Sequence, residues 1–295
     1  MLGTGKDRMS RRKRKDHILT ALIGFSALLS VTILVGIIGY VFYRGIRNVS
    51  LDFLVTVQSP VRGAMGIAGN IVNTLYIVIL TLAAAVPAGV GSAIYLNEYA
   101  RPGKLVSMIE FTMETLTGIP SVLFGLFGNV FFGEVLGLGY SMLTGAFTLM
   151  LMVLPLIARN TQEALRTVPE NYRSGALGMG AAKWYMIRTI LIPSAMPGIL
   201  TGIILAVGRI VGESAALLFT AGSGFYLPKP GMGLAKKVFE SGGTMTIEMY
   251  LQMAKGNYDV AFAIASVLLI LVLFMNFLTR SVVARFGAEG RKERK

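Results

Sequence analysis

The sequence predicts an all-α, polytopic membrane protein with six transmembrane helices, and three observations lead to this fold class. Hydrophobic residues make up 54 % of the 295 residues and charged residues only 15 %, with a mean hydropathy of +0.66. This balance is typical of an integral membrane protein and is rare in soluble domains. The apolar runs have helical length and lack the alternating pattern of membrane β-strands. The net charge of +13 lies mainly at the ends of these runs, which favours loops between spans over a nucleic-acid surface.

The six predicted spans are identified by their length and by the residues that flank them. The first, 18–43, follows the basic stretch RRKRK and is too long for the apolar region of a cleaved signal peptide. The other five spans cover about 71–96, 108–132, 138–158, 197–221 and 260–283. The third is broken by TGIPS, in which Pro120 and Ser121 mark either an ordinary proline kink or a pathway or gate where backbone lines a cavity.

Six spans place both termini on one side of the membrane, and the basic residues indicate which side. The N-terminal tail, the turn ARPGK, the link between the fourth and fifth spans and the C-terminal tail are all rich in Lys and Arg, which predicts that they are cytosolic. The opposite loops also carry some Lys and Arg, so the asymmetry is imperfect. The predicted organisation is a cytosolic tail (1–17), a first helix (18–43), an extracytoplasmic loop (44–70), a permease core (71–284) and a second cytosolic tail (285–295). The core contains a cytosolic coupling segment at 159–192.

The fifth span carries two charges, Arg209 and Glu213, inside LTGIILAVGRIVGESAALLFTAG. A charge at the centre of a membrane helix costs about 2.5 to 3.5 kcal/mol, so it is rarely kept without a partner or a task. On one continuous helix, both charges share an arc of about 140° with four glycines, so this face is predicted to meet protein or a pore. The glycines are Gly198, Gly202, Gly208 and Gly212. The pair is either a self-neutralising ion pair at i,i+4 or a substrate site.

The link between the fourth and fifth spans carries a long spaced motif, SGALGMGAAKWYMIRTILIP. It resembles the EAA signature of ABC importer permeases, in which E-A-A, three residues, Gly and nine residues precede I-x-L-P. Ser174, Gly175 and Ala176 occupy the first three places and Gly180 the glycine. The resemblance implies that 166–180 is a helix that docks in an ATPase cleft. Ser174 replaces the motif glutamate, and Glu163 or Glu170 would then supply its salt bridge.

Further stretches narrow the resemblance to one family. SLDFLVTVQSP, AVPAGVGSAIYLNEYA, ETLTGIPSVLFGLFG and GRIVGESAALLFTAG are together similar to the PstA-type permease subunits of phosphate ABC importers, which have a MetI-like fold. The resemblance implies a PstC-type permease partner, an ATPase dimer, an extracytoplasmic phosphate-binding protein, and a bacterial or archaeal inner membrane. It also implies that Arg209 and Glu213 serve phosphate passage. A guanidinium fork matches paired phosphate oxygens, and Glu213 at i+4 can hold Arg209 when the site is empty.

Other classes are disfavoured by missing motifs. The chain has no P-loop, so ATP and Mg²⁺ are expected on the partner ATPase, and no cofactor or metal is expected here. With no cysteine, one histidine (His17) and no hydrolase motif, an enzyme is not expected. The alternatives are a PstC-type subunit, a permease for another oxyanion, or a secondary transporter, for which no inverted repeat is seen. The loop at 222–259, with its Gly and Pro residues, is expected to meet the binding protein.

Overall fold

The computed structural model describes residues 4–59, 64–227 and 234–292, and almost all of its ordered elements are helices. Five helices are long and apolar enough to cross a membrane, which confirms the predicted all-α membrane fold. They are α1 (Thr4–Gly45), α3 (Ala68–Ile94), α6 (Met142–Arg166), α9 (Ile192–Gly212) and α13 (Tyr258–Lys292). A bent pair, α4 (Lys104–Gly118) with α5 (Ser121–Gly128), brings the number to six if it is counted as one span.

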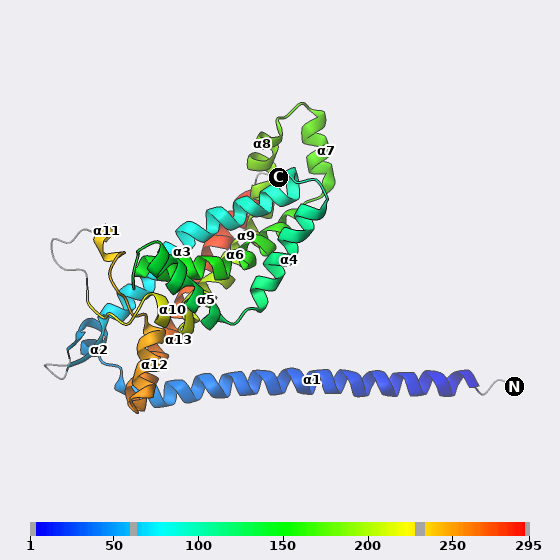
Figure 1. Cartoon of the computed structure of the whole chain (residues 1–295). Helices are drawn as coiled ribbons and strands as arrows, with labels where there is room; N and C mark the ends of the chain where they lie inside the picture. Colours follow the sequence, from blue (N-terminus) through cyan, green and yellow to red (C-terminus); the bar gives the residue numbers. More distant parts are fainter. Residues whose placement is uncertain (1–3, 60–63, 228–233, 293–295) are drawn as a thin grey trace.

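Helix α1 lies apart from the body of the molecule and touches it only near its C-terminal end (Figure 1). There Gly45 meets α13 so closely that an added Cβ would lie 2.1 Å from the carbonyl oxygen of Phe262. The Ser266 hydroxyl donates to the Val41 carbonyl at 3.2 Å. The most apolar window of α1 is 0 % buried within the chain. This is the surface that a membrane span presents to lipid or to another subunit.

The core of the body forms where α3, α6 and α9 pack together. The largest apolar cluster joins residues of these helices, among them Ile77, Leu149 and Ile210, and all three are essentially buried. Small residues permit this close packing, because a Cβ on Gly198 or Gly202 would lie only 2.5 or 2.6 Å from a side chain of α6. The predicted small-residue contact of the fifth span is therefore present for these two glycines, and its partner is α6.

Two of the predicted spans are interrupted rather than continuous. The axes of α4 and the segment from Ser121 to Val135 differ by 105° around Ile119 and Pro120, a far larger turn than an ordinary proline kink. The fifth span departs from the prediction, since α9 ends at Gly212 and Glu213 has extended backbone angles (φ −80°, ψ 126°). The short α10 (Ala215–Thr220) then begins a new helix.

The segments that follow the two interruptions pack against each other. An added Cβ on Gly125 of α5 would lie 2.8 Å from the Cα of Ala216 in α10. Phe124 and Ala216 are both buried in the main apolar cluster. The two interruptions are thus parts of one packed unit.

One end of the body carries the link between α6 and α9 (Figure 1). The link contains α7 (Glu170–Gly178), α8 (Lys183–Met186) and the π-helix η4 (Ile187–Leu191), and side chains of α7 and α8 bond to the π-helix η2 (Tyr95–Tyr99) that ends α3. The predicted single helix over 166–180 is therefore wrong in detail. Helix α6 continues to Arg166, and a turn that ends at Pro169 separates it from α7. The proline nitrogen of Pro169 cannot donate the hydrogen bond that would continue α6, and this residue is the N-cap of α7.

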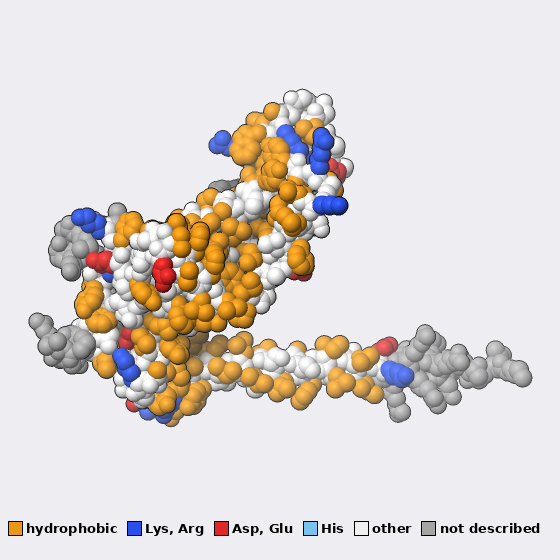
Figure 2. All heavy atoms as spheres, viewed as in Figure 1, with side chains coloured by type: hydrophobic (Ala, Val, Ile, Leu, Met, Phe, Trp, Pro, Cys, Tyr) orange, Lys and Arg blue, Asp and Glu red, His pale blue; other side chains and the backbone are white. Residues whose placement is uncertain are grey.

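The opposite end carries short elements from three loops. They are η1 (Ile46–Asn48), α2 (Leu51–Val55), the antiparallel hairpin β1 (Val57–Ser59) and β2 (Ala64–Ile67), the π-helix η3 (Asn129–Val135), α11 (Leu234–Lys237) and α12 (Met245–Ala254). Residues 228–233 of the loop expected to meet a binding protein lie outside the described residues. Figure 2 shows hydrophobic side chains along α1 and across the body, with most charged ones toward its ends, as expected for a bilayer-spanning chain.

Candidate functional site

The predicted charged pair sits where the fifth span is interrupted. Arg209 lies in the last turn of α9 and is exposed, whereas Glu213 follows the end of that helix and is half-buried. Their expected i,i+4 ion pair is absent from the salt bridges of the described residues. The reason is geometric, because an i,i+4 contact requires both residues on one helix and the backbone of Glu213 is extended.

Glu213 instead stabilises the interruption itself. Its Oε1 accepts a hydrogen bond from the backbone N–H of Ala216 at 3.0 Å, which satisfies a free donor at the start of α10. Its backbone carbonyl accepts from the Thr246 hydroxyl at 2.9 Å, so the same residue is bound to α12. The side chain therefore has a structural task whether or not it also meets a substrate.

Arg209 is left with its donors available. No hydrogen bond or ion pair joins its guanidinium to any part of the chain that the structure describes. The glycines on either side, Gly208 and Gly212, have no atom within 4 Å of where a Cβ would lie, so the surface around Arg209 is open. A planar set of five N–H donors at an open position can bind paired oxygens of an anion.

Pro120 and Ser121 occupy the other interruption. Pro120 is exposed and is the N-cap of α5, and Ser121 is half-buried at the first position of that helix. The close packing of α5 on α10 through Gly125 and Ala216 places both interruptions in one unit, but no hydrogen bond among the described residues links Pro120 or Ser121 to the charged pair. The structure gives these two residues a place at a helix break and leaves their role as gate a prediction.

The predicted coupling residues lie on α7 and directly after it. Ser174 and Gly175 are exposed on the outer face of α7, whereas Ala176 is 4 % exposed and packs with Met186 and Ile187. Gly180 has φ +83°, a backbone conformation that favours glycine, and nothing lies within 4 Å of its missing side chain. Close approach of an ATPase to Gly180 stays a prediction, because these contacts are only those within this chain. Within the chain, the turn after α7 is sufficient reason for a glycine at this position.

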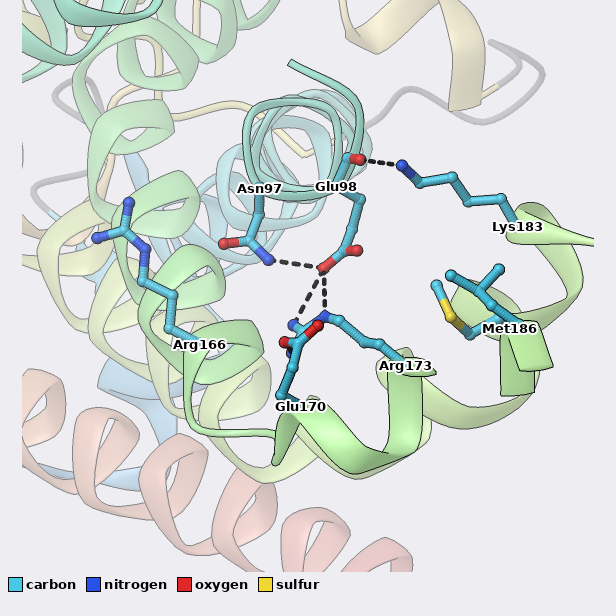
Figure 3. A pocket seen from close by; sticks show the side chains of 8 residues that line it. Asn97, Glu98, Arg166, Glu170, Arg173, Lys183 and Met186 are labelled. Atoms are coloured by element: carbon cyan, nitrogen blue, oxygen red, sulfur yellow. Dashed lines mark hydrogen bonds and ion pairs between the residues drawn. The ribbon is translucent and has the colours of Figure 1, made fainter. Parts of the chain in front are cut away.

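A buried ion pair beside the motif is the main feature that the sequence reasoning missed. Arg173 donates from Nη2 and Nε to the Oε1 of Glu98 at 3.1 and 3.3 Å, and the two side chains are 13 % and 5 % exposed. Asn97 donates to the same oxygen at 2.7 Å (Figure 3). These residues line a pocket of about 450 Å³ between η2 and the link. No local spacing rule relates positions 98 and 173, so only the fold reveals the pair.

Arg173 and Lys183 tie the link to the rest of the chain from two sides. Arg173 also donates to the carbonyl oxygens of Leu165 and Val168 at 2.9 and 3.0 Å, at the end of α6. Lys183 of α8 donates to the backbone oxygen of Glu98, and its Nζ lies 4.9 Å from the ring centre of Tyr99. Both basic residues therefore converge on the end of α3.

The two glutamates expected to replace the motif glutamate are both on the surface. Glu170 is 77 % exposed and accepts a hydrogen bond from Arg173 at 3.2 Å. Glu163 is exposed on α6 and lines a pocket of about 140 Å³ together with Arg159 and Arg166. Either carboxylate is accessible from outside the chain, and the position of Glu170 at the start of α7 is the nearer to Ser174.

Comparison with known proteins identifies a family and relatives that this chain resembles. Residues 85–288 match the family described as "binding-protein-dependent transport system inner membrane component". The chain is 34 % identical over 283 residues to the probable ABC transporter permease protein YqgI of Bacillus subtilis, covering 91 % of this chain and 95 % of the relative. It is 31 % identical over 246 residues to the phosphate transport system permease protein PstA of Xylella fastidiosa, covering 82 % and 83 %.

Solved structures of ABC transporters share the fold. A bacterial transporter involved in the import of the acidic polysaccharide alginate superimposes with a TM-score of 0.63 at 19 % identity, over 93 % of this chain and 99 % of its own. The MetNI methionine transporter, in an inward-facing conformation, gives a TM-score of 0.56 at 21 % identity, over 77 % and 95 %. At such identities the likeness extends to the fold alone.

Proposed function

Because this chain belongs to the binding-protein-dependent transport system inner membrane components, and is thus a permease subunit of an ABC importer, we propose that its substrate is phosphate and that it is the PstA-type subunit. The observation that carries the proposal is the open, unpaired Arg209 at the break between α9 and α10. The relatives that are named phosphate permeases support the same substrate.

The chemistry of Arg209 suits a tetrahedral oxyanion. Guanidinium stays protonated even when partly desolvated and donates two parallel hydrogen bonds to paired oxygens. Glu213 lies four residues away with one oxygen held by Ala216. The carboxylate can accept a hydrogen bond from the hydroxyl of hydrogen phosphate and would repel an anion that carries no proton. Arg209 then binds the substrate, and Glu213 contributes to its selection.

The proposed assembly supplies what this chain lacks. Its sequence has no ATP-binding loop, so hydrolysis belongs to a separate ATPase dimer that holds ATP and Mg²⁺. The outer face of α7, with Ser174 and Gly175, is the proposed ATPase contact. A PstC-type permease completes the path, and a phosphate-binding protein docks at the opposite end. We place the complex in the cytoplasmic (inner) membrane with both termini of this chain cytosolic.

The fold does not choose the substrate, because it also serves a methionine transporter and an alginate transporter. A permease for sulfate or molybdate is the rival within the same class, and a PstC-type role is the rival within the phosphate family. Each rival predicts a different result from the proposed function. A molybdate or sulfate permease would leave phosphate uptake unchanged, and a PstC-type subunit would function only with a PstA-type partner.

The experiment is uptake of radiolabelled phosphate in a bacterial strain that lacks its own phosphate permeases. The chain is expressed with its candidate partner permease, ATPase and binding protein, and an ATPase variant unable to hydrolyse ATP is the control. We expect ATP-dependent phosphate uptake that unlabelled sulfate does not compete away. Uptake of sulfate or molybdate in place of phosphate would refute the proposed substrate and retain the importer class.

A further inference from the structure

Helix α3 connects the two ends of the body, and side-chain hydrogen bonds join each end of it to the loops there. At one end, Asn70 donates to the carbonyl of Gly243 at 3.0 Å and Asn73 to the carbonyl of Gly224 at 2.9 Å. The backbone N–H of Met245 donates to the Thr74 hydroxyl at 3.0 Å. These partners lie in the loop after α10 and at the start of α12. At its other end, α3 passes into η2, which carries Glu98.

The ion pair between Glu98 and Arg173 is expected to hold its two elements firmly together. Both side chains are nearly buried, and the carboxylate oxygen accepts from Arg173 and Asn97 together. Removing one charge of a buried pair leaves the other uncompensated, so such a pair does not open easily. The pair between Arg166 and Glu110 is different, because it spans 3.5 Å between side chains that are 63 % and 42 % exposed. Pairs of that kind contribute little and exchange readily with water.

The guanidinium of Arg173 also fixes the beginning of the link. It donates to the carbonyl of Leu165, which also accepts from the backbone N–H of Val168, and to the carbonyl of Val168 in the turn after α6. One side chain therefore joins α7, the end of α6 and the end of α3. Arg173 stands directly before Ser174, so this inward-facing joint is adjacent to the exposed face of α7.

We propose that Arg173 and Glu98 are positioning residues of the coupling step, which lock α7 to the end of α3 so that a displacement of α7 moves α3 as a whole. Helix α3 then carries the displacement to Asn70 and Asn73 and so to the loops at the far end. The inference rests on the proposed function only in requiring an ATPase that moves α7, and it is independent of which anion is transported.

The test is hydrogen–deuterium exchange on the complete importer in lipid nanodiscs, without nucleotide and with ATP bound to a hydrolysis-deficient ATPase. In the unmodified complex, we expect ATP to change exchange in α7, at residues 94–99 and at residues 69–75. In Arg173→Ala and Glu98→Gln, we expect the change in α7 to persist and the change at 69–75 to be lost. Arg101→Ala is the matched control, since Arg101 is exposed just beyond η2, and it should behave like the unmodified protein.

Two further variants separate positioning from folding. Arg173→Lys keeps the charge and should retain part of the response, and the charge exchange Glu98→Arg with Arg173→Glu should restore part of what either single change removes.

The proposal is overturned if ATP leaves hydrogen exchange at residues 69–75 unchanged in the unmodified complex, or if Arg173→Ala retains the full response there. Loss of the ATPase from both single variants and from the exchange would also overturn it, because the pair would then be needed for docking. ATP alone drives this readout, so absence of phosphate uptake would refute only the proposed substrate.

Discussion

The carboxylate of Glu213 lies 3.0 Å from the backbone nitrogen of Ala216 and accepts its hydrogen bond, while Arg209, on the preceding turn of α9, has no ion-pair partner among the described residues. The two charges that a continuous helix would have paired are thus separated by the helix break that one of them stabilises. Because Glu213 holds the break and Arg209 makes no such bond, substitutions can separate their contributions.

Glu213→Gln should preserve the break and test the charge. The amide oxygen of Gln can still accept from Ala216, so we expect normal membrane levels and thermal stability. Glu213→Ala loses that bond, and a hydrogen bond to a charged group contributes about 1.5 to 3 kcal/mol. Thermal unfolding of the purified complex measures this difference. Phosphate uptake that falls in both variants, with stability lost only in Glu213→Ala, would show that the charge itself serves transport.

Arg209→Lys should reduce phosphate uptake by at least roughly tenfold, equivalent to about 1.4 kcal/mol, and Arg209→Ala should abolish it. Lysine keeps the charge but replaces a planar fork with one compact ammonium that loses its proton more readily when desolvated. Stability should be unchanged, because no hydrogen bond or ion pair joins the Arg209 side chain to the described residues. Initial uptake rates, normalised to protein in the membrane, are the measurement.

The double variant Arg209→Ala with Glu213→Ala separates the two interpretations of the charged pair. A self-neutralising pair predicts that removing both charges restores function. A substrate site predicts that the double variant reaches the membrane, retains its ATPase and still does not transport. Recovery of uptake in the double variant would return the pair to a purely structural role.

Gly180 should tolerate Asn but not Val. Its φ of +83° costs a residue with a Cβ roughly 1 to 2 kcal/mol, more when the side chain is β-branched, whereas Asn adopts this conformation comparatively easily. We expect Gly180→Val to weaken copurification of the ATPase and Gly180→Asn to retain it. The side chain of Gly180→Asp has the shape of that of Gly180→Asn but carries a charge. If ATP hydrolysis is uncoupled from transport in Gly180→Asp and not in Gly180→Asn, Gly180 lies against the ATPase. Membrane levels should be similar in all three.

Gly125→Val should disturb the unit formed by the two helix breaks. The new Cβ would meet the Cα of Ala216 at 2.8 Å, a backbone contact that cannot move aside as a side chain can. Overpacking of this kind costs typically about 1 to 3 kcal/mol. Thermal unfolding should report the loss, with Gly91→Val as the control, since nothing lies within 4 Å of Gly91. Equal stability of the two variants would contradict the packing of α5 on α10.

Much of the fold follows from patterns that act locally. Runs of about 20 apolar residues specify spans because the bilayer leaves backbone groups no partner except within a helix. The break at Pro120 was also predictable, since proline lacks the donor that continues a helix. The break at Glu213 was not, because GRIVGESAALL contains no proline and is compatible with a continuous helix. Its break is fixed by contacts with Ala216 on one side and Thr246 of α12 on the other.

The membrane class, the approximate positions of the spans, the two charges in the fifth span and the family resemblance of the segment from Ser174 to Pro193 all follow from the sequence alone. These depend on composition and on spacing along the chain. The folded structure is needed to see that Arg209 and Glu213 do not pair and that Arg173 is nearly buried against Glu98, 75 positions away. A charge next to a membrane span can face water, lipid or another helix. Its sequence neighbours do not choose among these, because the partner that neutralises it is brought near only when the helices pack.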